Sequence, residues 1–218
     1  MNFVPVGLLG LGFLSGIRHA FGIDHIAAVS AISRHSSIKK SSMLGMFWGL
    51  GHTIALFFAG MIVLLLKITI PDKLALSLEW IVAAMLIILG INVLLAVREE
   101  KVHVHRHKHG NAEHLHFHSY KSAEHHKHGH VPFRKSLIIG LMHGLAGSAA
   151  LTLLILASIS STMLGLTYIL VFGAGSMLGM ILVSAIISLP FRLIPNKLHN
   201  AQRLLRLSTG LISITVGP

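Results

Sequence analysis

The chain has 218 residues, of which 53% are hydrophobic and 11% are charged, and it contains no cysteine. Soluble domains carry about 25% charged residues, so this composition and a mean hydropathy of +0.75 indicate a membrane protein and exclude an ordinary soluble domain. The missing cysteines exclude disulfides and thiolate metal sites, and the net charge of +11 lies in loops between apolar stretches, which argues against a nucleic-acid partner.

Six apolar stretches have the composition of transmembrane helices, which need about 20 residues each. The first covers residues 3–32 and is too long for one straight crossing, so we expect it to tilt, break or re-enter. The other stretches follow at residues 43–66, 76–97, 137–157, 163–189 and 204–216. The sequence therefore predicts an all-α polytopic membrane protein with about six helices. The first residues contain neither a basic segment nor a small-residue cleavage site, so we do not expect a signal peptide.

The distribution of basic residues predicts the orientation in the plasma (inner) membrane. Fifteen of the 18 Lys and Arg residues lie after the first, third and fifth stretches, whereas the opposite side holds only Lys67 and Lys73. Because Lys and Arg are enriched in cytoplasmic loops, we expect both termini outside and the long middle loop in the cytoplasm.

A shift of 124 residues aligns the two halves of the chain. It places the first member of each pair on the second: Gly16 and Gly140, His19 and His143, Gly49 and Gly173, Gly51 and Gly175. Three helices per half is an odd number, so the halves would be inverted repeats, an architecture common in secondary transporters. We expect a first repeat over residues 1–98, a loop over 99–135 and a second repeat over 136–218.

Polar side chains interrupt the first stretch, "GIRHAFGIDHIAAVS", and the second carries His52. The first stretch supplies Arg18, His19, Asp24 and His25. An ionisable group inside a membrane costs about 2.5–3.5 kcal/mol or more and by default marks a functional site. A purely structural role is the alternative. Imidazole and carboxylate together suit Ni²⁺, Co²⁺ or Zn²⁺.

Helix geometry sets a condition on this group. On a regular helix Asp24 lies about 140° around the axis from His19, and His25 lies about 100° further. These side chains converge on one ion only if the helix breaks, and Gly22 lies where a break is easiest. On the second stretch, Gly49 and Gly51 are expected to allow close helix packing that brings His52 near.

"RHAFGIDH" contains the pattern H-x4-D-H and is followed by "FWGLGHT". These segments resemble the two leading signatures of the nickel/cobalt transporter (NiCoT) family, in particular its short urease-accessory-type (UreH-like) relatives, and "GLMHGLAGSAALTLL" extends the likeness into the second half. The resemblance implies His19, Asp24, His25 and His52 as metal ligands. The chain differs from the family in having Gly22 at a usually acidic position and no carboxylate at residues 146–149.

Two sets of residues are secondary candidates for metal binding. His143, the equivalent of His19, and Ser148, the equivalent of Asp24, are possible ligands from the second repeat, with backbone packing as the alternative for His143. The middle loop is histidine-rich and is expected to be disordered and to buffer metal, with a pH-sensitive polycation or a plain spacer as alternatives. Its histidines are His103, His105, His107, His109, His114, His116, His118, His125, His126, His128 and His130.

The expected function is secondary transport of a divalent metal, most favourably Ni²⁺ or else Co²⁺, which is cargo and not a fixed cofactor. Two alternatives are an exporter with the same site and a non-transporting accessory that passes nickel to urease or hydrogenase maturation proteins or a metallochaperone. A membrane enzyme is disfavoured because the stretches hold so few carboxylates. The sequence contains no nucleotide-binding motif, so we do not expect ATP-driven pumping.

Overall fold

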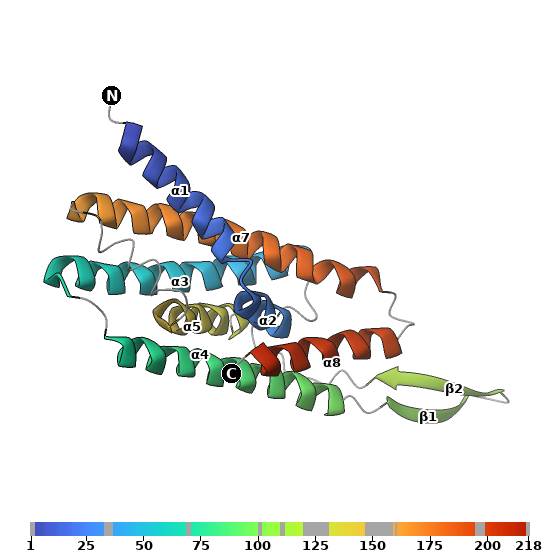
Figure 1. The fold of residues 1–218 in the computed structure, drawn as a ribbon. Helices are drawn as coiled ribbons and strands as arrows, with labels where there is room; N and C mark the ends of the chain where they lie inside the picture. The colour runs from blue at the N-terminus through green and yellow to red at the C-terminus, as the bar shows by residue number, and fades with distance from the viewer. Residues whose placement is uncertain are drawn as a thin grey trace.

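A computed structural model describes residues 3–32, 37–68, 71–99, 102–109, 112–119, 131–146, 159, 161–194 and 199–216. Helices form one bundle, and a hairpin extends from one end of it (Figure 1). The elements are α1 Phe3–His19, α2 Ile23–Ile32, α3 Ile38–Leu66, α4 Asp72–Glu99, β1 Val102–His109, β2 Ala112–Ser119, α5 Val131–Ala146, α7 Thr162–Leu193 and α8 His199–Val216.

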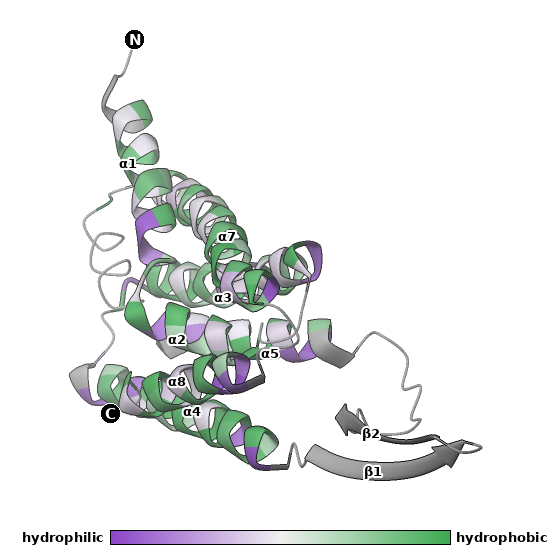
Figure 2. Ribbon diagram, turned by 90° about the vertical axis from the view of Figure 1, so that its right-hand side faces the viewer, coloured by the Kyte–Doolittle hydropathy of each residue, from purple (hydrophilic) through white to green (hydrophobic). Residues whose placement is uncertain are grey.

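Three helices are long and apolar enough to cross a membrane, namely α3, α4 and α7, and the bent pair α1–α2 makes up to four. Hydrophobic residues predominate along these helices (Figure 2), and many of them are exposed, such as Ile62, Ile88 and Leu182. The most apolar 18-residue segment of each of the three long helices has a mean hydropathy of 2.1–2.7. Only 39–50% of that segment is buried within the protein. Such exposed apolar surface suits lipid rather than water.

The two other predicted crossings correspond to α5 and α8. Within the described residues, neither is both long enough and apolar enough to cross a membrane. Helix α5 has 16 residues, and the predicted stretch at 137–157 continues beyond it, outside the described part. Helix α8 has 18 residues but is strongly amphipathic. The all-helical bundle is therefore observed, whereas six full crossings remain a prediction.

The first stretch is broken, as its length and its polar residues predict. Helix α1 ends at His19, α2 begins at Ile23, and the two are bent by 53°. Tight backbone bonds close the break, from Phe21 N–H to the Arg18 oxygen at 3.0 Å and from Gly22 N–H to the His19 oxygen at 2.9 Å. A Cβ on Gly22 would lie 2.5 Å from Asp24 Oδ1, so glycine leaves room for that carboxylate.

Helices α3 and α7 run antiparallel along a seam of small residues. A Cβ on Gly49 would lie 2.7 Å from the Met177 Cα, and one on Gly45 would collide with the backbone at Met180. The Thr53 hydroxyl lies 2.7 Å from the Gly49 oxygen of its own helix and 3.2 Å from the Gly173 oxygen of α7. Backbones approach this closely only where side chains are absent.

The glycine contacts form pairs related by the 124-residue shift. A Cβ on Gly16 would collide with the Phe172 oxygen, and one on Gly140, its equivalent, would collide with the oxygen of Trp48, the equivalent of Phe172. Likewise Gly51 lies against the Leu137 oxygen, and its equivalent Gly175 lies against the oxygen of Phe13, the equivalent of Leu137. Helix α1 therefore packs on α7 in the way that α5 packs on α3.

The middle loop differs from the predicted disorder, because residues 102–109 and 112–119 form an antiparallel β-hairpin. The sequence alternates histidine with other residues over both strands. This two-residue period is the side-chain period of a β-strand.

Candidate metal centre

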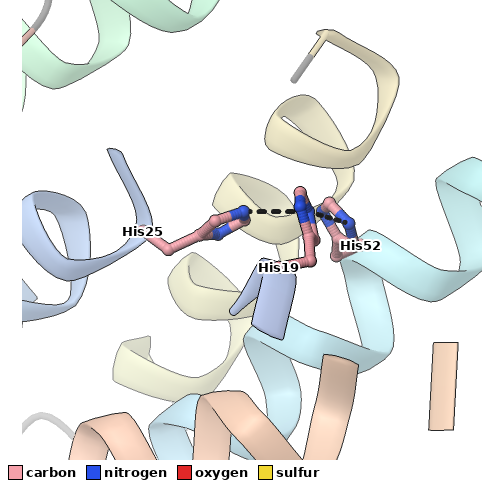
Figure 3. Close-up of side chains that lie close together, drawn as sticks. All are labelled: His19, His25 and His52. Atoms are coloured by element: carbon pink, nitrogen blue, oxygen red, sulfur yellow. Dashed lines mark hydrogen bonds between the residues drawn. The ribbon is translucent and has the colours of Figure 1, made fainter. Parts of the chain in front are cut away.

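Three imidazoles meet at the break between α1 and α2. His19 ends α1, His25 lies in the first turns of α2, and His52 lies in the middle of α3. Their Nε2 atoms point toward one another (Figure 3), at 3.0 Å between His25 and His19 and at 3.2 Å between His19 and His52. The structure thus brings together three of the four predicted ligands through nitrogen atoms of one kind.

Hydrogen bonds alone do not satisfy this arrangement. A ring nitrogen of neutral imidazole carries either one hydrogen or one lone pair, so the Nε2 of His19 serves only one of its two neighbours. A cation at the centre would accept a lone pair from all three nitrogens. Metal–nitrogen bonds of about 2.0–2.1 Å place neighbouring nitrogens about 3.0–3.4 Å apart, which is the separation seen here.

Asp24 belongs to a second group of side chains beside the first. Its Oδ2 lies 2.9 Å from the Nε2 of His143 on α5 and 3.9 Å from the Nε2 of His25. The ligand atoms of Asp24, His25 and His143 all lie within 4.8 Å of one another, as do those of His19, His25 and His52. His25 is the residue that both groups contain.

The surroundings are apolar and closely packed. The side chains of His25, His52 and His143 are 0–1% exposed, and Asp24 is 33% exposed. The Trp48 ring lies 5.8 Å from the His143 ring, measured between centroids. Among the described residues the Nδ1 atoms of these three histidines have no hydrogen-bond partner, so their Nε2 atoms carry the polar contacts.

The remaining predicted site residues lie elsewhere. Arg18 is exposed on α1, where it lies about 100° around the helix axis from His19. Ser176, the equivalent of His52, is buried and its hydroxyl has no partner among the described residues. Ser148 and four of the loop histidines lie outside the described residues, namely His125, His126, His128 and His130.

The seven other loop histidines share one face of the hairpin. Cross-strand partners are His103 with His118, His105 with His116, and His107 with His114. Residues opposite one another and residues two apart on a strand lie on the same face, and this face also includes His109. The contact between Asp24 and His143, 119 residues apart, had no signal in the sequence beyond the repeat that equates His143 with His19.

Comparison with known proteins places these features in context. Residues 6–217 match the family described as High-affinity nickel-transport protein (NicO). The urease accessory protein UreH of Bacillus sp. (strain TB-90) is 38% identical over 213 residues, which cover 97% of this chain and 89% of UreH. No solved structure matches the chain significantly.

Two plant proteins are more distant relatives. The chloroplast proteins FOR GROWTH AND FERTILITY 2 and 1 of Arabidopsis thaliana are 24% and 26% identical over 94% of this chain. The chain spans 54% and 56% of their lengths, so it matches about half of each of them.

Proposed function

The chain belongs to the family of high-affinity nickel-transport proteins and is a multi-pass membrane protein, and from this premise we propose that it is a secondary transporter for Ni²⁺. The ion would bind His19, Asp24, His25 and His52 near the middle of the bilayer. The observation that carries this proposal is the meeting of three Nε2 atoms at 3.0 and 3.2 Å.

The ligand set suits the divalent ions Ni²⁺, Co²⁺ and Zn²⁺. Imidazole nitrogen and carboxylate oxygen suit borderline divalent metals, while the chain has no cysteine for ions that prefer thiolate. Membership of the nickel-transport family favours Ni²⁺ among these ions, and Co²⁺, which takes the same ligands, is the alternative cargo. The proposed activity is transport and requires no chemical conversion.

Two inverted repeats would provide alternating access to the site. The contact of Gly16 with the Phe172 oxygen and that of Gly140 with the oxygen of the equivalent Trp48 support this architecture. Gly90 on α4 similarly lies against Ile214, its own equivalent on α8, as expected at a pseudo-twofold axis. Rocking of one repeat against the other would open the site to either side in turn.

The driving force follows from the charge of the ion. With the basic loops in the cytoplasm, a divalent cation entering across 100 mV would gain about 4.6 kcal/mol, from about 2.3 kcal/mol per elementary charge. We therefore propose import driven by the membrane potential. Export through the same site would give the opposite net flux.

A second candidate function has one observation in its favour. The relative UreH is called a urease accessory protein, and 38% identity over 97% of this chain supports a role beside urease maturation. In that role the chain would supply nickel to maturation proteins, by transporting it or only by binding it.

Uptake of radioactive nickel into proteoliposomes tests the transport proposal. We expect wild-type protein to take up Ni²⁺ faster when a potassium gradient makes the interior negative. His52→Ala is expected to reduce the initial rate about tenfold or more, because it removes a direct ligand. Ser176→Ala, at the equivalent position of α7, is the matched control and should keep the wild-type rate. Equal rates for wild type, His52→Ala and empty liposomes would leave only the accessory role.

The hairpin is proposed to hold metal on the cytoplasmic side of the membrane. Its register brings three pairs of histidines opposite one another, and paired imidazoles chelate better than isolated ones. A variant with His103, His105 and His107 changed to serine is expected to bind fewer Ni²⁺ ions per chain but to keep the uptake rate at saturating Ni²⁺. Changing Val102, Val104 and Arg106 to serine, on the opposite face, is the control. Equal loss of bound nickel in both variants would refute a specific histidine face.

A further inference from the structure

We propose that the metal centre offers the ion two overlapping positions and that His143 is a ligand of the second. This inference rests on the proposed transport function and goes beyond it. The first position is formed by His19, His25 and His52. The second is formed by the carboxylate of Asp24 with the imidazoles of His25 and His143.

The ligand atoms form a compact cluster in which each lies close to the next. From His52 the successive separations are 3.2 Å to His19, 3.0 Å to His25, 3.9 Å to Asp24 and 2.9 Å to His143. An ion held by the three imidazoles needs to keep only its bond to His25 while it exchanges two nitrogen ligands for Asp24 and His143. No large backbone movement is needed for an exchange between positions that share a ligand.

Equivalent surroundings support His143 as a ligand residue and not merely a neighbour. The His19 ring lies 5.5 Å from the ring of Phe172, and the His143 ring lies 5.8 Å from the ring of Trp48. Phe172 and Trp48 are themselves equivalent under the shift of 124 residues. His143 on α5 therefore lies against α3 in the way that His19 on α1 lies against α7.

Burial argues in the same direction. His143 is 0% exposed and its Nδ1 has no hydrogen-bond partner among the described residues, so its polar contact in the apolar bundle is made through Nε2. That atom faces a carboxylate on one side, and the His25 ring lies with its centroid 4.2 Å away from the His143 ring. A cation between these groups would be bound by one oxygen and two nitrogens, which is a donor set suited to Ni²⁺.

The main alternative is that His143 only holds Asp24 in place by a hydrogen bond. The two roles differ in what transport requires. If His143 is a ligand of a second position, its loss leaves the first position intact, so binding persists while movement of the ion stops. If it only orients Asp24, a side chain that donates the same hydrogen bond should replace it.

The test uses full-length protein whose eleven loop histidines are changed to serine, so that loop binding does not contribute. We expect His143→Ala to bind radioactive nickel at equilibrium within about threefold of its parent, yet to take it up at least about tenfold more slowly in proteoliposomes. His143→Gln keeps a donor for Asp24 and is a poor ligand, so it should behave like His143→Ala.

Three outcomes would overturn the inference: restored uptake in His143→Gln, equal losses of binding and uptake in both variants, or no loss in either. A separate variant, His52→Ala in the same background, tests the proposed function itself. If the protein does not transport nickel, His52→Ala leaves uptake unchanged. Thermal unfolding of both His143 variants, compared with that of the parent, shows whether each one folds.

Discussion

His25→Ala is expected to abolish nickel binding at the metal centre, with an apparent affinity at least about 100-fold lower than that of the parent. His25 contributes to both groups of ligand atoms, so its removal leaves each group with two members. Its ring is also fully buried. Equilibrium dialysis with radioactive nickel, in the protein with serine in place of the loop histidines, measures this loss.

Ser30→Ala is the matched control for His25→Ala. Ser30 is buried on the same short helix, and its hydroxyl donates only to the Ile26 oxygen one turn earlier. Removing that hydroxyl leaves the ligands in place, so nickel affinity should stay within about twofold of the parent. Equal losses in the two variants would mean that α2 tolerates no change, and the assignment of His25 as a ligand would lose its support.

Gly16→Ala is expected to destabilise the bundle by about 1–3 kcal/mol, the usual cost of forcing extra volume into a packed core. The added methyl would collide with the Phe172 oxygen of α7, and the Ser176 nitrogen lies 2.8 Å from its position. Backbone atoms do not rotate aside, so α1 would move away from α7 and His19 would move with it. The free energy of unfolding in mixed micelles measures the effect.

Gly10→Ala, on the same helix, is the control for that substitution. No atom of the described residues lies within 4 Å of a Cβ added at this exposed position, so the methyl enters open space. The change should be neutral or should stabilise the helix by up to about 1 kcal/mol through helix propensity. If both alanines leave stability unchanged, the close contact between α1 and α7 is not what holds the bundle together.

Much of the site could be predicted because its requirements are local. The spacing of His19, Asp24 and His25 is incompatible with a regular helix if the three act together, and the observed bend lies between them. The packing of Gly49 followed from the absence of a side chain in an apolar stretch. Apolar stretches of membrane-spanning length located α3, α4 and α7, although each helix is a few residues longer than predicted.

The rest depended on contacts distant in sequence. Asp24 on α2 and His143 on α5 are 119 residues apart, and they come together only in the folded bundle. Arg18 lies beside His19 in sequence, so composition alone grouped it with the ligands, whereas helix rotation turns it outward. The hairpin was missed because its sequence is rich in charged residues and histidine, whereas backbone pairing requires no hydrophobic pattern.

X-ray absorption at the nickel edge is the most direct test of the central claim, made on full-length protein in nanodiscs with the loop histidines changed to serine. Our account predicts one bound Ni²⁺ with at least two imidazole ligands at about 2.0–2.1 Å, and the loss of this imidazole signal in His25→Ala. A spectrum with only oxygen ligands, or one that His25→Ala leaves unchanged, would contradict a metal centre at the break between α1 and α2.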